Sequence, residues 1–124
     1  MLGVPLDSVL IRALVLIPLG TVLAEELAFR GVLHAPAVRV LPVRAALVVT
    51  SVVFGLWHVV TALGSQTVTA PTPWVAVAGV VAFTALSGLL LGWLRHRTGS
   101  ILAPMGLHLG TNAVGLLAAA IALH

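Results

Sequence analysis

The chain has 124 residues, of which 60% are hydrophobic and only 7% charged, and its mean hydropathy is +1.21. Soluble domains carry about a quarter charged residues, so this composition excludes a water-soluble globular fold and predicts a protein that resides in the lipid bilayer. The six arginines give a formal net charge of +3, but they lie beside apolar runs rather than in one basic patch, which argues against a nucleic-acid partner.

Four stretches of the chain are apolar over the roughly 20 residues that a membrane-crossing helix needs. They run over Leu6–Leu33, where we expect Pro36 to stop the helix, and over Val43–Leu63, Trp74–Leu94 and Ile101–Leu123. Apolar residues surround these stretches on most faces, so neither a strand nor a half-buried soluble helix fits them. The predicted fold is all-α, a polytopic bundle of about four transmembrane helices.

The connections between these stretches differ in charge, and this difference predicts the topology. The first and third connections are rich in arginine, whereas the second, residues 64–73, has no charged residue. Positive charge marks the cytoplasmic side of a membrane, so we expect both termini to face the opposite side. His34, His96 and His124 lie at connections or at the terminus, and we expect them to be solvated.

Two acidic residues, Glu25 and Glu26, lie within the first apolar stretch. Placing an ionised acid near the bilayer centre costs on the order of 3 kcal/mol of free energy, so two adjacent acids there indicate a structural or functional role. Glu26 and Arg30 are four residues apart and can pair on one helix face, whereas Glu25 is rotated by about 100°. This geometry predicts a neutralised, structural Glu26 and a Glu25 that faces a polar cavity; the alternative is a pair at the membrane interface, held by Arg30.

Further polar side chains occur at helical spacing on the second and fourth stretches. Phe54 and His58 are four residues apart, as are His108 and Asn112. Polar residues in lipid turn inward and meet one another, so we expect His58, His108 and Asn112 to join Glu25. At about 1.5 Å per residue, His58 lies about 22 Å along its helix and His108 about 10 Å along its own. Their convergence therefore requires tilted helices or a later helix start.

Two glycine pairs have the GxxxG spacing that permits close helix contact in membranes. They are Gly88 with Gly92 and Gly106 with Gly110. The spacing predicts that each pair packs against a neighbouring helix.

Several peptidase designs are excluded by the residues present. The chain has no cysteine, its only aspartate is Asp7, and it contains no GxSxG sequence. A zinc-binding HExxH motif is also absent, because Ala24 precedes Glu25. The remaining candidate is a glutamate, histidine and asparagine site, which would use water as the nucleophile and side-chain N–H groups as oxyanion donors.

Three motifs occur in order along the chain: EExxxR over Glu25–Arg30, FxxxH over Phe54–His58, and HxxxN over His108–Asn112. In this order and spacing the chain resembles the CPBP family, the CAAX proteases and bacteriocin-processing enzymes, also called the Abi family. The resemblance implies a single CPBP-like intramembrane peptidase domain over residues 1–124. Relatives normally carry further membrane helices before the EExxxR segment, so we expect a shortened N-terminus, a misplaced start or a minimal core.

The resemblance also implies an activity and the residues that perform it. Family members are intramembrane endopeptidases, so we expect a peptide or protein substrate in or at the membrane, and a multi-pass protein of the bacterial plasma membrane. By motif match, Glu25 with His58 would activate the attacking water, and His108 with Asn112 would hold the developing oxyanion. The supporting residues would be Glu26, Arg30 and Phe54.

The sequence allows alternatives both for metal use and for the class of function. Glu25, His58 and His108 could together bind zinc with one open position, although a metal-free glutamate mechanism is slightly favoured because asparagine is a poor zinc ligand. The same cluster could belong to a non-catalytic membrane module for bacteriocin immunity or partner binding, or to a proton or ion pathway.

Overall fold

The computed structural model describes residues 5–64 and 73–122. Within these ranges the chain forms helices and no strand, which confirms the predicted all-α fold. Four helical segments are long and apolar enough to cross a membrane: Asp7–Val40, Val43–Gly64, Trp74–Thr98 and Leu102–Ala122. This architecture is that of an integral membrane protein. Most of the second connection and His124 lie outside the described residues.

The first membrane segment is one continuous helix made of five parts. These are α1 (Leu6–Ile11), η1 (Arg12–Leu23), α2 (Ala24–Glu26), η2 (Leu27–Leu33) and α3 (His34–Val40), and the two η parts are π-helical. The expectation that Pro36 stops this helix is wrong, because Pro36 lies inside α3. Prolines are tolerated within membrane helices where neighbouring helices and wider turns accommodate the lost backbone donor, and wide turns directly precede α3.

The long helix ends instead at Leu41, whose φ of −121° and ψ of 151° are extended. Pro42 follows, and the residue before a proline is driven away from helical geometry. Helix α4 (Val43–Gly64) begins at once, with the N–H of Ala46 donating to the carbonyl oxygen of Pro42 at 2.9 Å. The turn between α3 and α4 therefore follows from the Leu41–Pro42 pair.

Helices α5 (Pro73–Thr98) and α6 (Leu102–Ala122) are joined by a tight turn. Gly99 has a φ of +68°, and its N–H donates to the carbonyl oxygen of Arg95 at 3.0 Å. Glycine is the usual residue at this left-handed position after a helix. The hydroxyl of Ser100 then accepts the N–H of Leu102 at 3.2 Å and caps α6.

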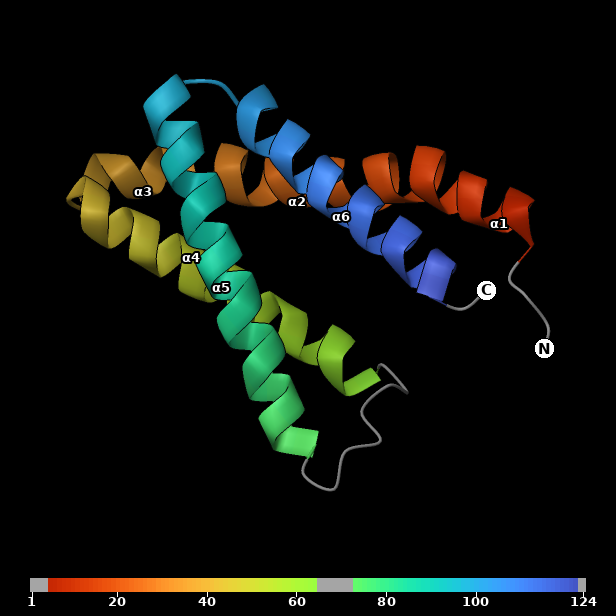
Figure 1. The fold of residues 1–124 in the computed structure, drawn as a ribbon. Coiled ribbons are helices and arrows are strands. Elements are labelled where there is room, and N and C mark those ends of the chain that lie inside the picture. The colour runs from red at the N-terminus through yellow and green to blue at the C-terminus, as the bar shows by residue number, and fades with distance from the viewer. Residues whose placement is uncertain (1–4, 65–72, 123–124) are drawn as a thin grey trace.

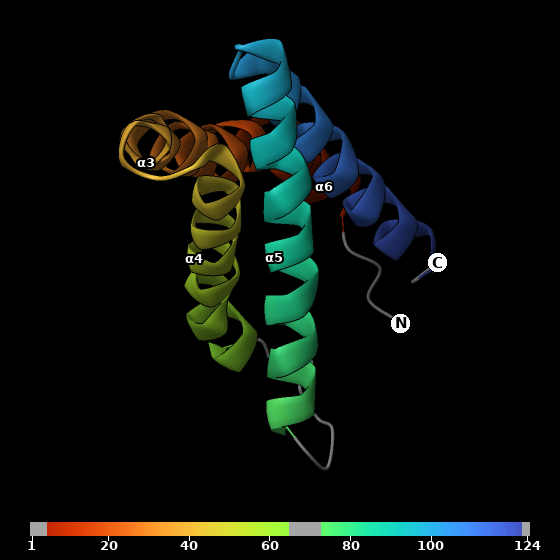
Figure 2. The same ribbon diagram turned by 90° about the vertical axis from the view of Figure 1, so that its left-hand side faces the viewer.

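The four membrane segments are not parallel. Helices α4 and α5 run side by side in opposite directions, and in Figure 2 the long first helix is seen nearly end-on beside them, so it crosses them steeply. Helix α6 leans away from α4 and packs against α5 and η1, and both chain ends lie toward the α1 end of the long helix (Figure 1).

Glycines permit the close contact between α4 and α5. A Cβ on Gly88 would lie 2.9 Å from Cδ1 of Phe54, and one on Gly92 would lie 3.2 Å from Cδ2 of Leu47. The first GxxxG prediction is therefore confirmed. The second is wrong, because a Cβ on Gly106 or Gly110 would meet nothing within 4 Å. These two glycines lie on the exposed face of α6, while His108 between them is buried.

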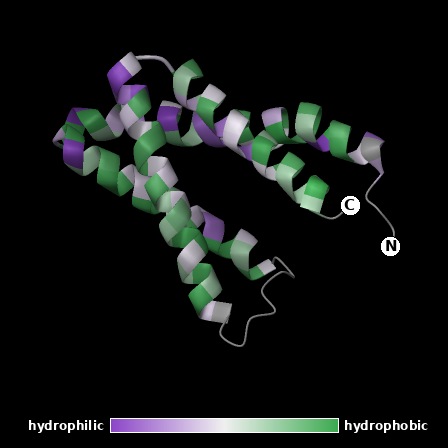
Figure 3. Ribbon diagram, in the orientation of Figure 1, coloured by the Kyte–Doolittle hydropathy of each residue, from purple (hydrophilic) through white to green (hydrophobic). Residues whose placement is uncertain are grey.

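The molecule has an apolar exterior and a polar centre. Leu14 and Val32, for example, are 70% and 76% exposed, whereas Glu26 is 0% and Arg30 2% exposed. Figure 3 shows hydrophobic segments along every membrane helix, with hydrophilic segments in the middle of the long helix and near its α3 end. Such an exterior suits a lipid solvent, in which polar side chains turn toward the interior of the protein.

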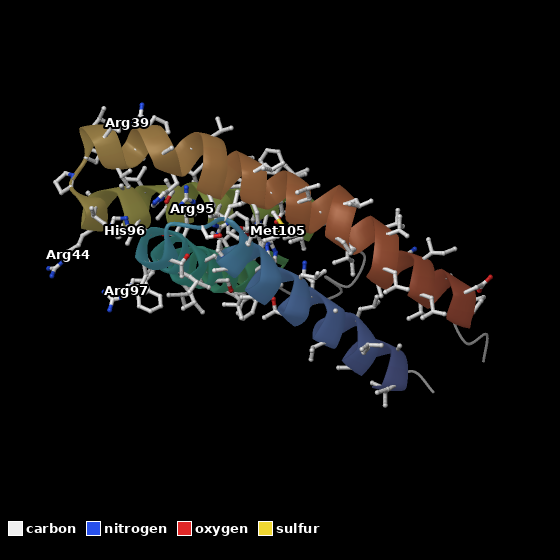
Figure 4. The ribbon with its side chains drawn as sticks, turned by 90° about the horizontal axis from the view of Figure 1, so that it is seen from above. Arg39, Arg44, Arg95, His96, Arg97 and Met105 are labelled. Carbon is white, nitrogen blue, oxygen red and sulfur yellow. The ribbon has the colours of Figure 1, made fainter. Side chains whose placement is uncertain are left out.

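The arginine-rich connections lie at the same end of the molecule. Figure 4 shows Arg44, Arg95, His96 and Arg97 at this end, with Arg39 on the far side of α3. The expected placement of the first and third connections on one side is therefore observed. The assignment of that side to the cytoplasm stays a prediction from the positive charge.

Candidate active site

Glu26 is held at the centre of the molecule by Arg30. The Nη1 atom of Arg30 lies 3.1 Å from Oε1 of Glu26, in ion-pair contact rather than an aligned hydrogen bond. A second guanidinium nitrogen, Nη2, donates to the carbonyl oxygen of Gly88 on α5 at 3.2 Å, and the guanidinium carbon lies 4.3 Å from the centroid of the Phe54 ring. The predicted pair is therefore present and ties the long helix to α4 and α5.

Glu26 has a second partner that sequence reasoning missed. The Nδ1 atom of His108 lies 2.8 Å from Oε1 of Glu26. A carboxylate paired with Arg30 is ionised and accepts, so this imidazole nitrogen carries a proton and donates. The bond joins α2 to α6 across 82 residues of sequence, and no local spacing indicates it.

Glu25 faces two imidazoles from different helices. Its Oε1 lies 3.9 Å from Nε2 of His58, and its Oε2 lies 3.7 Å from Nε2 of His108. Both distances exceed a hydrogen bond, which would be about 3.2 Å at most. Oε2 is buried and has no hydrogen-bond partner within the described parts of the chain. Glu25 is therefore the unneutralised member of the acidic pair, and the gap between it and each ring can admit a bridging group.

The tautomer of His58 follows from its local partner. Its Nδ1 lies 2.8 Å from the backbone carbonyl oxygen of Phe54. A carbonyl can only accept, so Nδ1 carries a proton, and in a neutral ring Nε2 keeps its lone pair. The acceptor nitrogen of His58 therefore points toward Glu25, which suits a water molecule that donates to both groups.

Phe54 packs both histidines from one side. Its ring centroid lies 4.8 Å from that of His58, 6.0 Å from that of His108 and 4.9 Å from that of Phe29, all in edge-to-face geometry. Phe54 is almost fully buried. It therefore fixes the imidazole planes and carries the guanidinium of Arg30 on its face.

The candidate residues border one cavity of about 470 Å³. Glu25, His58, His108 and Asn112 all line it, so the structure brings together the four residues expected at the active site. His58 and His108 lie at different distances along their own helices, but both reach the cavity because α4 and α6 are not parallel (Figures 1 and 2). Helix α4 begins at Val43, as expected. Tilt, and not a later helix start, is therefore the explanation.

One wall of the cavity comes from α5, which carries none of the three motifs. This wall consists of Phe83, Thr84, Ser87, Leu90 and Leu91. The hydroxyl of Thr84 donates to the carbonyl oxygen of Val80 at 2.8 Å, and that of Ser87 to the carbonyl oxygen of Phe83 at 2.9 Å. Two hydroxyl residues three apart in an apolar helix are the only sequence signal that could have indicated this wall.

The expected zinc ligands do not form a metal-binding group in this structure. Across residues 5–64 and 73–122, no three His, Cys, Asp or Glu side chains are arranged to hold a metal ion. The Nδ1 atoms of His58 and His108 are both engaged, as the outer nitrogens of zinc ligands usually are. Glu25, His58 and His108 carry donor atoms that zinc binds, but the three side chains are not arranged around a common point in this structure.

The histidines outside the cavity differ from expectation in one case. His96 is exposed as expected, but His34 is only 4% exposed, so the prediction of a solvated His34 is wrong. The cause is the continuation of the helix past His34, which places this residue against α5 rather than in a loop. The centroids of the His34 and His96 rings lie 6.2 Å apart.

Comparisons with known proteins give one match. A family profile described as type II CAAX prenyl endopeptidase Rce1-like matches residues 7–114, which is most of the chain and includes every residue of the cluster. No curated protein and no solved structure matches.

Proposed function

Because the chain belongs to the Rce1-like family of type II CAAX prenyl endopeptidases, we propose that it hydrolyses peptide bonds within the membrane with Glu25 as the general base. The observation that carries this proposal is the convergence of Glu25, His58, His108 and Asn112 on one cavity. Intramembrane ionisable residues mark functional sites, and these four come from three helices.

Water is the nucleophile in this proposal. A water molecule about 2.8 Å from each partner can bridge Glu25 and His58, whose facing atoms are 3.9 Å apart. Glu25 takes one proton from this water as the oxygen attacks the substrate carbonyl carbon. The same carboxyl group then gives the proton to the leaving amine as the carbon–nitrogen bond breaks.

The oxyanion formed in this step needs donors. The side-chain amide of Asn112 supplies N–H groups and cannot titrate in the working range. His108 supplies a second donor when Nε2 also carries a proton, and the hydrogen bond from Nδ1 to Glu26 holds the ring in place. Glu26 and Arg30 act through His108 and Phe54, and are therefore positioning residues.

The cavity indicates the kind of substrate. Part of its lining is apolar, from Phe83, Leu90 and Leu91 on α5 and Leu107 on α6, beside the polar residues of the cluster. Phe83, which lines it, is 72% exposed, so the wall borders the lipid. A peptide segment at the membrane, with an apolar group beside the scissile bond, fits this lining.

The substitution Glu25→Gln tests the proposal. It keeps the shape of the side chain and removes the base, so we expect cleavage to fall by about 10²–10⁴-fold while membrane insertion is unchanged. The purified full gene product in proteoliposomes would be assayed on farnesylated CAAX peptides and on membrane-anchored peptides, with and without a chelator. Asp7→Asn, the same chemical change at the remaining acid, is the matched control. Undiminished cleavage by Glu25→Gln would remove this residue from the mechanism.

A further inference from the structure

A second cluster of ionisable side chains lies at the arginine-rich end of the molecule, away from the cavity. It consists of His34 on α3 and of Arg95 and His96 on α5. His34 is 4% exposed, its ring centroid lies 6.2 Å from that of His96, and the positive charge of Arg95 acts on it. The catalytic proposal uses none of these three residues.

Two nitrogens of this cluster are buried and lack a partner. They are Nδ1 of His34 and Nε of Arg95, for which the described part of the chain offers no hydrogen bond. Buried polar side-chain atoms nearly always have a partner, and a guanidinium N–H can only donate. The missing partner of Arg95 is therefore an acceptor.

The protein itself has no acid to fill this place. The whole sequence contains three acidic residues. Glu25 and Glu26 are engaged in the central cluster, and Asp7 lies in α1, at the opposite end of the long helix (Figure 1). The described part of the chain supplies no acid at this end, so a negatively charged acceptor for the cluster would come from outside it.

The position of the cluster identifies the source of that anion. Figure 4 shows Arg44 and Arg97 at the same end of the molecule, near His96. Exposed apolar side chains occur at this end as well, such as Val40 on α3 and Leu102 on α6, which are 79% and 71% exposed. Basic side chains between membrane helices, beside apolar surface, suit a phosphate that is attached to acyl chains.

We propose that His34, Arg95 and His96 form a binding site for the headgroup phosphate of an anionic phospholipid, at the end of the molecule where α3 meets α5. Arg95 and the two imidazoles donate to the phosphate oxygens, and the acyl chains lie along the exposed apolar side chains nearby. The site is separate from the peptidase cavity, and the proposal does not depend on the peptidase activity.

Lipid binding to the detergent-purified full chain tests the site. Native mass spectrometry would measure retention of phosphatidylglycerol against phosphatidylcholine with the same acyl chains. We expect preferential retention of phosphatidylglycerol, and about tenfold weaker retention by Arg95→Gln because a charge-assisted hydrogen bond is lost. Arg39→Gln is the matched control, since it removes the same charge from an exposed residue on the far side of α3, and we expect it to bind like the wild type.

Each other outcome overturns the proposal. Equal retention of the two lipids by the wild type would show that no anionic site exists, and equal losses in Arg95→Gln and Arg39→Gln would show general charge attraction. If inorganic phosphate alone displaced phosphatidylglycerol at an equal concentration, the ligand would be a soluble phosphate. Should Arg95→Gln fail to fold, His96→Gln at an exposed position carries the same test, and undiminished binding by that variant would exclude the site.

Discussion

Neighbouring residues in one helix have opposite surroundings in this protein. Glu26 is fully buried, paired with Arg30 and bonded to His108. Glu25 faces a cavity, and its carboxylate oxygens lie 3.9 Å and 3.7 Å from the nearest imidazole nitrogens, beyond hydrogen-bond distance. Glu26, together with Arg30, therefore joins the long helix to α5 and α6, whereas Glu25 makes no close polar contact.

This division predicts different effects of the same substitution. Glu26→Gln leaves Arg30 as a buried, unpaired cation, so we expect a loss of about 3–5 kcal/mol in stability together with a loss of activity. Glu25→Gln should lose activity with little change in stability, because Glu25 has no close partner to lose. Unfolding of both variants in mixed micelles, followed by circular dichroism, would check this. A fully stable Glu26→Gln variant would contradict the structural role of Glu26.

Much of the central cluster could be predicted from the sequence, and the reason is physical. Polar residues in an apolar helix have few places to go, so the spacing of Glu26 and Arg30 sufficed to predict their ion pair, which the structure contains. The bond from His108 to Glu26 could not be predicted, because it depends on the angle between two helices. His34 was misjudged for a related reason, since its burial depends on where the long helix ends.

At the scale of the element, prolines and glycines predicted helix ends and helix contacts correctly at some positions and wrongly at others. Pro42 ends a helix, whereas Pro36 lies inside one, because the wide turns of η2 precede it. Gly88 and Gly92 pack closely against α4, but a Cβ on Gly106 or Gly110 would meet no described atom within 4 Å. A proline or glycine permits a particular bend or close contact of the backbone, and the position of the neighbouring helix determines whether that bend or contact forms.

The closest contact between α4 and α5 gives a prediction at this scale. A Cβ on Gly55 would lie 2.7 Å from the carbonyl oxygen of Val81 and 2.8 Å from Cβ of Ala85. Backbone cannot yield easily, so we expect Gly55→Ala to destabilise the protein by about 1–3 kcal/mol. Gly79→Ala on α5 is the control, because its Cβ would meet nothing within 4 Å. Equal thermal midpoints for the two variants in detergent would contradict this packing.

At the scale of the whole molecule, the positive charge sets an orientation. The turns that follow α3 and α5 lie at the end that carries Arg44 and Arg97 (Figure 4), while α4 ends at Gly64 on the far side of its membrane span. Positive connections stay on the cytoplasmic side. The chain contains no cysteine, so a single introduced cysteine can be labelled without background from native thiols.

We therefore expect single cysteines at Ser100 and Gly64 to label from opposite sides of the membrane. An impermeant maleimide applied to intact cells should modify Gly64→Cys and spare Ser100→Cys until the membrane is opened. Leu41→Cys, in the other arginine-rich turn, should behave like Ser100→Cys. Labelling of all three from one side would contradict the four-span arrangement.

The length of the first helix has a consequence for the surrounding lipid. Its 34 residues measure up to roughly 50 Å, whereas the hydrocarbon layer is about 30 Å thick. Such hydrophobic mismatch is relieved by a slanted helix or a locally thickened bilayer. Glu25 sits on this helix and the imidazoles of His58 and His108 sit on others. The slant of the first helix in the bilayer therefore bears on the distance between the carboxylate and both rings.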